Sequence, residues 1–376
     1  MAVTISQEPA PYSPSGNPLM YEFSSDQTAQ ANFSYIVETY VGGVQVKEEQ
    51  VFLERATKAH IDIQETVDNL LSAPTVKTDF EADSGTSADI YIKVYENYGT
   101  PATNQASATS STTVAFKGEI SKERFVDVNF NTQYRVSKWL TNHPTNNITI
   151  LREQTACCSI LTDSAYDATI SYYDSAGALI TSYTTNQNRV IWQFNLTQFA
   201  LIADTGVTQP QLDNTAYFTL QVSTSDILTF TYLDDYCYNP KSLLWVNEYG
   251  SFDTFIFNHN DIRKGSNSSK SYTKQFGAWD GTTFGYDPLD SGAIDYVKTQ
   301  QIEGTLVSGY MTEEIHDFMV ELYDSPFYLL YDAAGNGAES VSITSNSWNY
   351  NQNRFDELIM EEVSYKLSNT KKSVRR

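Results

Sequence analysis

The chain has 376 residues, enough for two or three domains with real hydrophobic cores. Its 24 Lys and Arg residues stand against 46 Asp and Glu residues, which gives a formal net charge of −22 at pH 7. A chain this acidic repels phosphate groups, so the composition argues against nucleic acid and anionic membranes as partners. Aromatic residues make up 13% of the chain, which favours strands and argues against a disordered protein.

The cysteines and the apolar segments indicate in which compartment the protein is made. Three cysteines, with Cys157 and Cys158 adjacent and Cys237 alone, are too few for a disulfide scaffold and predict buried, inert thiols. The first residues have neither the basic segment nor the apolar segment of an export signal. No apolar run approaches the roughly 18 residues that a membrane span needs. We therefore expect synthesis in a cytoplasm and no membrane association.

Residues 1–20 are expected to form an extended, proline-rich N-terminal arm. Four prolines between residues 9 and 18 prevent a helix or a central strand, because proline lacks the amide donor and fixes φ. Such an arm can lie on its own chain or on a neighbouring copy. In an assembled particle we expect Tyr12, Leu19 and Met20 to be buried against an adjacent subunit or another tail protein. Deleting the arm would then leave the melting temperature of the monomer nearly unchanged.

A first β-domain is predicted over residues 21–145. Apolar residues alternate with polar ones over residues 33–41, and Gly42-Gly43 turns the chain into a returning strand. The stretch 62–71 changes to a helical period and predicts a short helix. Further strands are predicted at 89–95, 113–118 and 124–130, with an exposed loop over residues 100–112.

A second domain, a β-sandwich, is predicted over residues 146–240. The segments 168–173 and 179–183 predict a hairpin, with Gly177 in the turn where a positive φ is needed. Residues 195–202 predict one short helix that is capped by Asn195. Other strands are predicted near residues 148–161 and at 189–194, 216–222 and 227–232.

A C-terminal β-domain with one amphipathic helix is predicted over residues 241–370. The helix spans residues 312–325, and its apolar stripe consists of Ile315, Phe318, Met319 and Leu322. Its strands are predicted at 243–246, 271–276, 296–304, 327–331, 341–344 and 358–367. The basic tail, residues 371–376, is expected to be disordered. The whole chain is therefore predicted to be all-β, with mainly antiparallel β-sandwich-like domains and two or three short helices.

The search for catalytic or metal-binding motifs nominates no catalytic, cofactor-binding or metal-binding residue. The four histidines, His60, His143, His259 and His316, form no metal-binding motif, and His316 is expected on the polar face of a surface helix. No nucleotide-binding loop or nucleophile elbow is present. We therefore expect a protein that is not an enzyme and that needs no cofactor.

Acidic residues offer two weak alternatives. The neighbours Asp234-Asp235 and Glu361-Glu362 would point to opposite faces of a strand, so they are poor candidates for a glycosidase pair. Calcium would accept a cluster of acidic side chains in the third domain, although their spacing matches no twelve-residue calcium loop. These residues are Asp253, Asp261, Asp280, Asp287 and Asp290.

The tryptophans divide into two groups. Four lie in apolar or strand-like contexts and are expected in a core or an interface: Trp139, Trp192, Trp245 and Trp348. Trp279 lies in a Gly-Ala-Trp-Asp-Gly loop and is the best candidate for an exposed residue that anchors a glycan or a protein.

Several segments resemble structural proteins of the tail and virion of tailed phages that infect Bacteroidota, including crAss-like phages. The segment 245–257 resembles their tryptophan strand, which leads through Asn and Gly into an Asp and alternating aromatics, although its turn is poorer in glycine. Similar segments are found at 11–41, 271–276, 308–314 and 322–330, and in the closing strand with its Lys/Arg tail. The resemblance implies a structural role, and none of its motifs indicates a catalysed reaction.

The leading hypothesis is therefore a structural component of a bacteriophage virion, located in the tail after synthesis in the bacterial cytoplasm. It would be a ring, hub, baseplate or connector protein that forms a homo-oligomeric ring and docks other tail proteins, without direct recognition of nucleic acid. The main alternative is a receptor- or glycan-binding tail protein that uses Trp279. A weaker alternative is a tail enzyme that degrades polysaccharide.

Overall fold

The structure is a computed structural model that describes residues 3–54, 57–76, 81–82, 85–152, 154–188, 191–234, 239–259, 261–273, 277–279, 281–285, 292–332, 338–345 and 359–374. Its internal contacts divide the chain into two units: Met1–Asp234 with Leu244–Phe255, and Asp235–Leu243 with Ile256–Arg376. The domain boundary that the sequence predicts near residue 146 lies inside the first unit.

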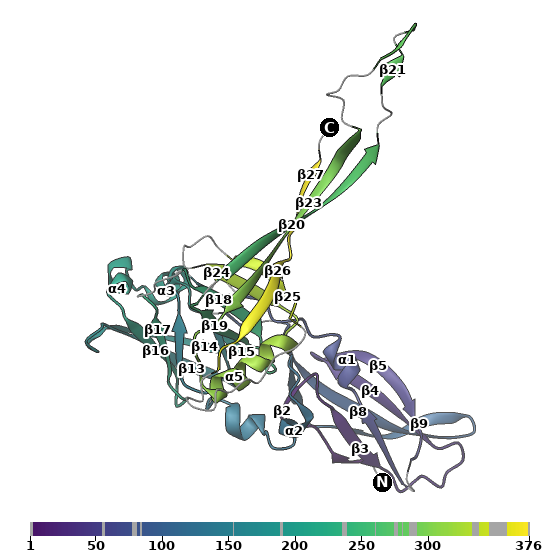
Figure 1. Ribbon diagram of the computed structural model, residues 1–376. Helices are drawn as coiled ribbons and strands as arrows, with labels where there is room; N and C mark the ends of the chain where they lie inside the picture. Colours follow the sequence, from purple (N-terminus) through teal and green to yellow (C-terminus); the bar gives the residue numbers. More distant parts are fainter. Residues whose placement is uncertain are drawn as a thin grey trace. The chain divides into compact units, whose positions relative to one another are not determined.

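The predicted all-β class is confirmed, since strands dominate both units (Figure 1). The helices are short but more numerous than the two or three expected. The described residues contain α1 (Gln64–Asp68), α2 (Lys122–Phe125), α3 (Gln198–Thr205), α4 (Gln209–Asp213), α5 (Glu313–Val320), a π-helical turn (Phe130–Tyr134) and a 3-10 turn (Glu321–Asp324). No helix in the described ranges is long and apolar enough to span a membrane.

Two sheets of the first unit share one hydrophobic core. The smaller has the order β1 (Thr4–Gln7), β3 (Met20–Ser24), β6 (Lys58–Asp62). The larger has the order β2 (Tyr12–Pro14), β10 (Thr113–Phe116), β8 (Ser87–Gly99), β4 (Ser34–Val41), β5 (Val44–Val51), with β9 (Ala102–Thr109) beside β8. Their buried side chains form one cluster, in which Phe23 and Tyr35 pack edge to face at 4.9 Å between ring centroids.

The N-terminal arm lies on its own chain. β1 pairs with β3, and β2 pairs in parallel with β10, so both strands stay at sheet edges as the prolines require. Tyr12 and Leu19 are buried, and the Asn17 side chain bonds both the N–H and the carbonyl of Ile120. The expectation that Tyr12 and Leu19 would wait for an adjacent subunit is therefore wrong. Met20 is half-buried.

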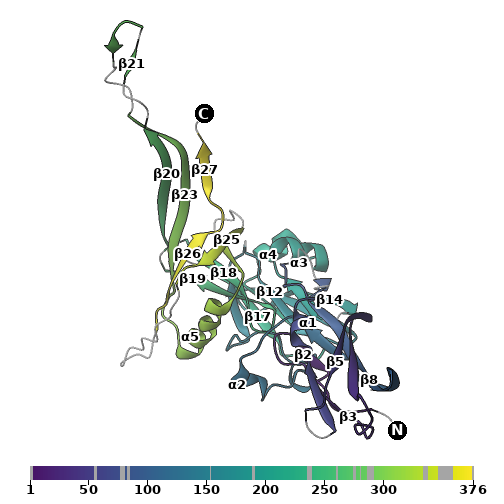
Figure 2. The ribbon, with the colours of Figure 1, turned by 90° about the vertical axis from the view of Figure 1, so that its right-hand side faces the viewer.

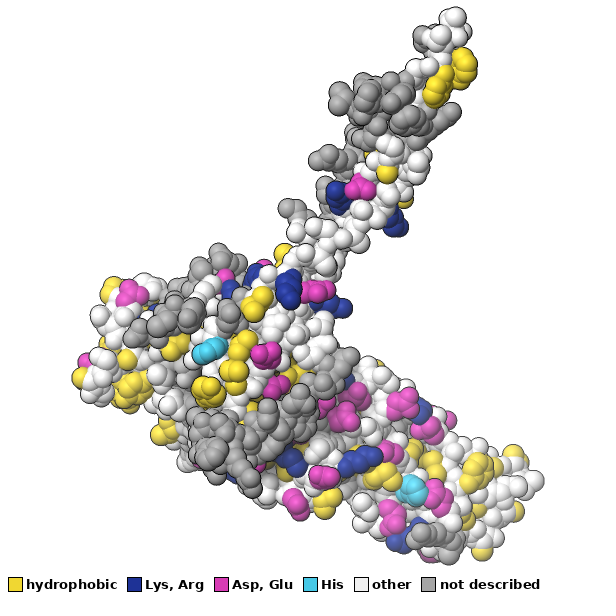
Figure 3. All heavy atoms as spheres, viewed as in Figure 1, with side chains coloured by type: hydrophobic (Ala, Val, Ile, Leu, Met, Phe, Trp, Pro, Cys, Tyr) yellow, Lys and Arg dark blue, Asp and Glu magenta, His cyan; other side chains and the backbone are white. Residues whose placement is uncertain are grey.

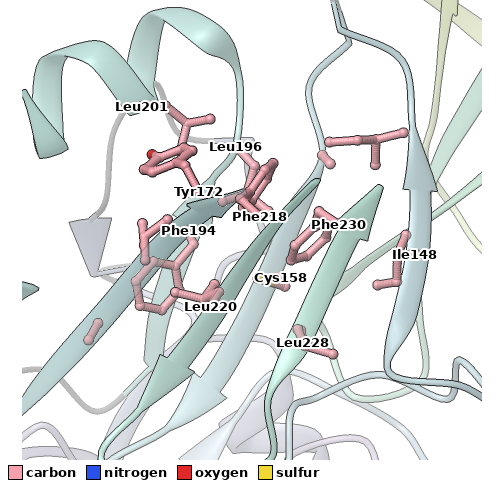
Figure 4. Packing of buried hydrophobic residues seen from close by; sticks show 14 of the residues in the cluster. Ile148, Cys158, Tyr172, Phe194, Leu196, Leu201, Phe218, Leu220, Leu228 and Phe230 are labelled. Atoms are coloured by element: carbon pink, nitrogen blue, oxygen red, sulfur yellow. The ribbon is translucent and has the colours of Figure 1, made fainter. Parts of the chain in front are cut away.

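A second pair of sheets in the first unit forms the core of the predicted sandwich (Figure 4). One sheet has the order β11 (Asn147–Ile150), β17 (Leu228–Tyr232), β16 (Tyr217–Val222), β13 (Ala165–Tyr173), β14 (Leu179–Asn188). The other has the order β12 (Cys157–Leu161), β15 (Ile191–Asn195), β7 (Glu81–Ala82). Cys158 and Phe194 from the second sheet meet Phe218 and Phe230 from the first, and the latter two rings stack at 5.1 Å between centroids.

Three local predictions in this unit are wrong. Residues 124–130 contain the end of α2, a turn and the first residue of the π-helical turn instead of a strand, because Phe130 and Tyr134 pack into a cluster with Tyr249. Residues 102–109 are exposed as expected except for the half-buried Ala106 and Ala108, but they pair with β8 as strand β9. The third helix begins at Gln198, and its cap is Thr197, whose hydroxyl accepts from the Ala200 N–H.

The second unit is built on an eight-stranded sheet. The order is β19 (Phe252–Phe257), β18 (Lys241–Val246), β24 (Tyr328–Asp332), β25 (Ala338–Ile343), β26 (Glu362–Leu367), β23 (Ala293–Val307), β20 (Asp261–Thr273), with β27 (Lys371–Val374) beside β23. The residues of β18 and β19 are divided between the two units. The tail expected to be disordered contributes β27, which pairs with β23 from Val297 to Gln300, whereas residues 375–376 lie outside the described ranges.

The predicted helix of this unit is confirmed. α5 follows Thr312, and Phe318, Met319 and Leu322 are buried along its apolar stripe. The adjoining turn contacts the sheet, since the Tyr328 hydroxyl of β24 donates to the carbonyl of Leu322 at 2.7 Å. A short two-stranded sheet, β21 (Ala278–Trp279) with β22 (Phe284–Gly285), lies between β20 and β23 in the sequence.

Candidate functional site

Strands β20, β23 and β27 form a segment that we call the ribbon. β20 and β23 pair antiparallel along their length, and both extend beyond the rest of their sheet, with β27 alongside (Figures 1 and 2). All β20 residues from Ile262 to Thr273 are exposed, and no β23 residue from Ala293 to Glu303 is buried. Over this stretch β20 therefore has two open faces, and β23 has no buried face.

The sequence explains why the ribbon has no core. Residues 264–271 read Lys-Gly-Ser-Asn-Ser-Ser-Lys-Ser, so they lack the alternating apolar positions that would turn one face toward a second layer. Hairpins without such a layer are marginally stable in water. A 13-residue strand of this kind gains little stability from side-chain packing within its own chain.

Aromatic side chains gather at the far end of the ribbon. Tyr272 and Tyr296 are 51% and 43% exposed, and their ring centroids lie 6.2 Å apart. Trp279 is 70% exposed and stands edge to face with Phe284, at 6.0 Å between centroids. Figure 3 shows hydrophobic side chains at this end, beyond a stretch that carries Lys and Arg. The prediction that Trp279 is exposed is confirmed, and the end of the ribbon is a candidate contact surface.

The other four tryptophans were expected in a core or an interface, and the two whose side chains are described fit this prediction. Trp139 and Trp245 are buried. Trp192 lies on β15, although its side chain is outside the description, and Trp348 falls outside the described residues.

The motif around Trp245 folds as a buried turn. The Asn247 side chain accepts from the N–H groups of Tyr249 and Ser251, both at 3.0 Å, and donates to Asp253 at 2.8 Å. Gly250 has a φ of +69°, and a Cβ there would collide with the carbonyl of residue 117. The Asn, Gly and Asp of the motif are thus accounted for by backbone geometry.

Asp253 lies at the centre of this turn. It is buried and also accepts from the Thr141 hydroxyl at 2.5 Å. Burial raises the pKa of the Asp253 carboxyl to about 6, although the bonds from Thr141 and Asn247 act in the opposite direction. These bonds join two distant segments of the first unit, so Asp253 serves the fold rather than a calcium site.

The side chains of the other proposed calcium ligands lie outside what the structure describes. Asp280, Asp287 and Asp290 fall outside the described residues, as does the side chain of Asp261. Among the residues that are described, no group of three or more His, Cys, Asp or Glu side chains could hold a metal ion.

The four histidines have different surroundings, with His60 and His143 in the first unit and His259 and His316 in the second. The Nδ1 of His60 lies 2.8 Å from Glu54, and the Nδ1 of His143 contacts the carbonyl of Thr145. His259 is exposed, whereas His316 is buried. The expectation that His316 lies on a solvated helix face is wrong, because the segment that contains Glu361 covers that face, with 3.7 Å between Nε2 and Oε2.

The two residues of the pair Glu361-Glu362 differ in burial. Glu361 is buried and accepts from the Tyr323 hydroxyl at 2.5 Å, whereas its neighbour Glu362 is exposed. Asp234 pairs with Arg152, and residue 235 lies outside the described residues. Neither pair forms a two-carboxylate site within the described structure.

The cysteines also match their prediction where they are described. Cys157 and Cys158 are buried in β12, and burial raises the pKa of the Cys158 thiol, which lowers its reactivity. Cys237 lies outside the described residues.

The ribbon is longer than the sequence predicts. In this part of the chain its patterns predict strands at 271–276 and 296–304, whereas β20 begins at Asp261 and β23 spans Ala293–Val307. The signal that could have revealed it is the long Ser/Asn/Lys-rich stretch after residue 261, which has strand-compatible length but no apolar face.

The comparisons with known proteins give no family. No family model and no curated protein matches the chain. Among solved structures, the chain is similar to the crystal structure of CBD12 from CALX1.2, at 7% identity, over 59% of this chain and 79% of that one. The TM-score is 0.19, so this similarity carries no argument about fold or function.

Proposed function

We propose that the protein is a structural component of a bacteriophage virion, most simply a ring, hub, baseplate or connector protein of the tail. The observation that supports a structural role best is the ribbon, because its length, open faces and lack of a core suit a partner surface. The phage assignment itself rests on the sequence resemblance of segments such as 245–257. The proposal gives the protein no catalytic role.

Negative-stain microscopy and light scattering of the purified protein test this proposal. We expect closed rings or a defined oligomer that contains many copies of the chain. A variant in which residues 264–300 are replaced by a short Gly-Ser turn should keep the buried cores of the first unit and lose the oligomer. A wild-type protein that stays monomeric at every concentration would contradict the self-assembly part of the proposal.

A second candidate, a receptor- or glycan-binding tail protein, is favoured by one observation. Trp279 and Phe284 are both exposed and lie together on a short two-stranded sheet, as aromatic platforms for sugars do. Binding of wild type and Trp279→Ala to host cells and surface glycans separates the two candidates. Loss of binding with the oligomer intact would favour the receptor-binding function.

A further inference from the structure

The sheet that contains β11, β17, β16, β13 and β14 has one face in the core and one face outside it. Side chains such as Phe218, Leu220 and Phe230 point into the core (Figure 4), so the residues that alternate with them point away from it. These outward side chains are exposed or half-buried. Most of them are Ser, Thr or Tyr, and we call their surface the hydroxyl face; they belong to residues 147–149, 169–173, 179, 182–184, 217–221 and 229–231.

Strand pairing aligns the hydroxyl face in rows that cross the sheet. One row contains Leu179, Tyr173, Tyr217, Thr231 and Thr149. The next contains Ser182, Ser171, Thr219, Thr229 and Asn147, and a third contains Thr184, Thr169 and Gln221. None of these side chains, all of which the structure describes, carries a charge. The outward side chains of β13 stay uncharged until Asp167, which accepts from the Asn186 amide at 2.7 Å.

The outer faces of the two N-terminal sheets differ from the hydroxyl face, because they are charged. Glu38 and Lys93 lie outward on β4 and β8, and Glu22 and Lys58 form an ion pair on the smaller sheet. The first unit as a whole contains 12 Lys or Arg and 28 Asp or Glu, a net charge of −16. Two copies therefore repel each other where acidic surfaces meet, whereas two hydroxyl faces can approach without opposing charges.

The chemistry of the hydroxyl face also makes it complementary to itself. A hydroxyl group can donate one hydrogen bond and accept two, so the same face on a second copy supplies both kinds of partner. The bonds within the face use part of this capacity, since Thr169 pairs with Thr184 at 3.2 Å and Ser171 with Ser182 at 2.9 Å between hydroxyl oxygens. The cores of protein interfaces are depleted in charged residues and enriched in Tyr, as this face is.

The two tyrosines favour a protein partner over a sugar. The rings of Tyr173 and Tyr217 are nearly parallel, with 9° between their planes and 4.9 Å between their centroids. Parallel rings this close on neighbouring strands stand on edge, so they turn their faces toward each other and their edges and hydroxyls outward. A sugar that stacks on an aromatic residue needs a ring face that is open to solvent.

We propose that the hydroxyl face of one copy packs against the hydroxyl face of a second copy, about a two-fold axis that passes near Thr219 of the central strand. The inference rests on the self-assembly part of the proposed function and not on the phage assignment. Because each face meets its own equivalent, the contact is isologous. An assembly in which every hydroxyl face is occupied therefore contains an even number of copies.

Charges placed at the axis test this contact. Thr219→Lys and Thr219→Glu each bring two like charges together in a pair of identical copies, whereas a mixture of the two variants brings opposite charges together. Ser171→Lys and Ser171→Glu, on the neighbouring strand, repeat the test at a second position. Matched controls are Thr109→Lys and Thr109→Glu, on the exposed strand β9. Circular dichroism checks that each variant folds, and light scattering against concentration gives the association constant.

We expect Thr219→Lys and Thr219→Glu to weaken association by about tenfold or more when each is alone, and their mixture to recover most of the loss. The Thr109 controls should associate like the wild type. Association that all the Thr219 and Ser171 variants leave unchanged would overturn this inference but not the proposed function. A wild type that never associates would overturn both. Binding of a neutral polysaccharide that the Thr219 variants weaken, without any effect on association, would assign the face to a glycan instead.

A cross-link gives a second test that does not depend on charge. Thr219→Cys is introduced into two differently tagged chains that also carry Cys237→Ser. Because each chain then has one cysteine at the axis, a disulfide between two such residues can only join two copies. A disulfide that joins the two tags is the expected result. Its absence under oxidising conditions, with the oligomer intact, would refute a two-fold axis near Thr219.

Discussion

Asp253 allows a quantitative test of the buried turn, because its protonation is linked to folding. Burial raises the pKa of its carboxyl from 3.8 to about 6 in the folded protein. Below about pH 4 the carboxyl is protonated in both the folded and the unfolded chain. Between pH 4 and pH 6 the unfolded chain loses this proton while the folded protein keeps it, so the free energy of unfolding falls as the pH rises.

The magnitude follows from the size of the pKa difference. About two pKa units correspond to about 3 kcal/mol, all of which is lost by about pH 7. Asp253→Asn removes the titration and can keep both hydrogen bonds, since an amide can accept from Asn247 and donate to Thr141. Relative to the wild type, Asp253→Asn should therefore gain about 3 kcal/mol of stability between pH 4 and pH 7.

The assay is urea unfolding at several pH values, followed by tryptophan fluorescence, to which the buried Trp245 of the same turn contributes. Asp127→Asn, at an exposed site, is the control and should show no such change with pH. A stability difference between Asp253→Asn and the wild type that stays constant from pH 4 to pH 7 would refute the reasoning.

Three further predictions concern packing. Phe318→Ala should lower the unfolding free energy by about 3–5 kcal/mol in a thermal melt, whereas Tyr310→Ala, at a 70% exposed site, should change it by less than about 0.5 kcal/mol. Gly304→Ala should lower the melting temperature, because its Cβ would lie 2.5 Å from the ring of Tyr365, and Gly292→Ala, with open space around it, should not. Deleting residues 3–18 should lower the melting temperature of the first unit, since it removes two strands and buried side chains; an unchanged melt would show that these residues add little to the fold.

Local signals in the sequence predicted the local parts of the fold. The hairpins at Gly42-Gly43 and Gly177 formed where expected, because those glycines adopt the positive φ that their turns need. α5 was also predictable from local signals, because Thr312 before it, its apolar stripe and the proline after it all lie within 15 residues.

Features set by distant residues were not predictable. Residues 124–130 have the alternation of a strand, but Phe130 packs against Phe116 and Tyr249, which lie far away in the sequence. His316 occupies a polar position of α5, and only the fold brings Glu361 over it. The candidate site was not predicted, because alternating apolar residues indicate a strand only where one face of that strand is buried. The ribbon has no buried face of this kind.

The pairing of β2 with β10 has a consequence for synthesis on the ribosome. Tyr12 pairs with Val114, so about 100 further residues must be made before the N-terminal strand finds its neighbour. At translation rates of 5–20 residues per second this delay lasts about 5–20 s. Throughout that time Tyr12 stays outside the cluster of buried residues in which it ends, a cluster that also contains Phe116. Until β10 has been made, β2 is a segment that chaperones can bind, and its docking depends on strands that are translated much later.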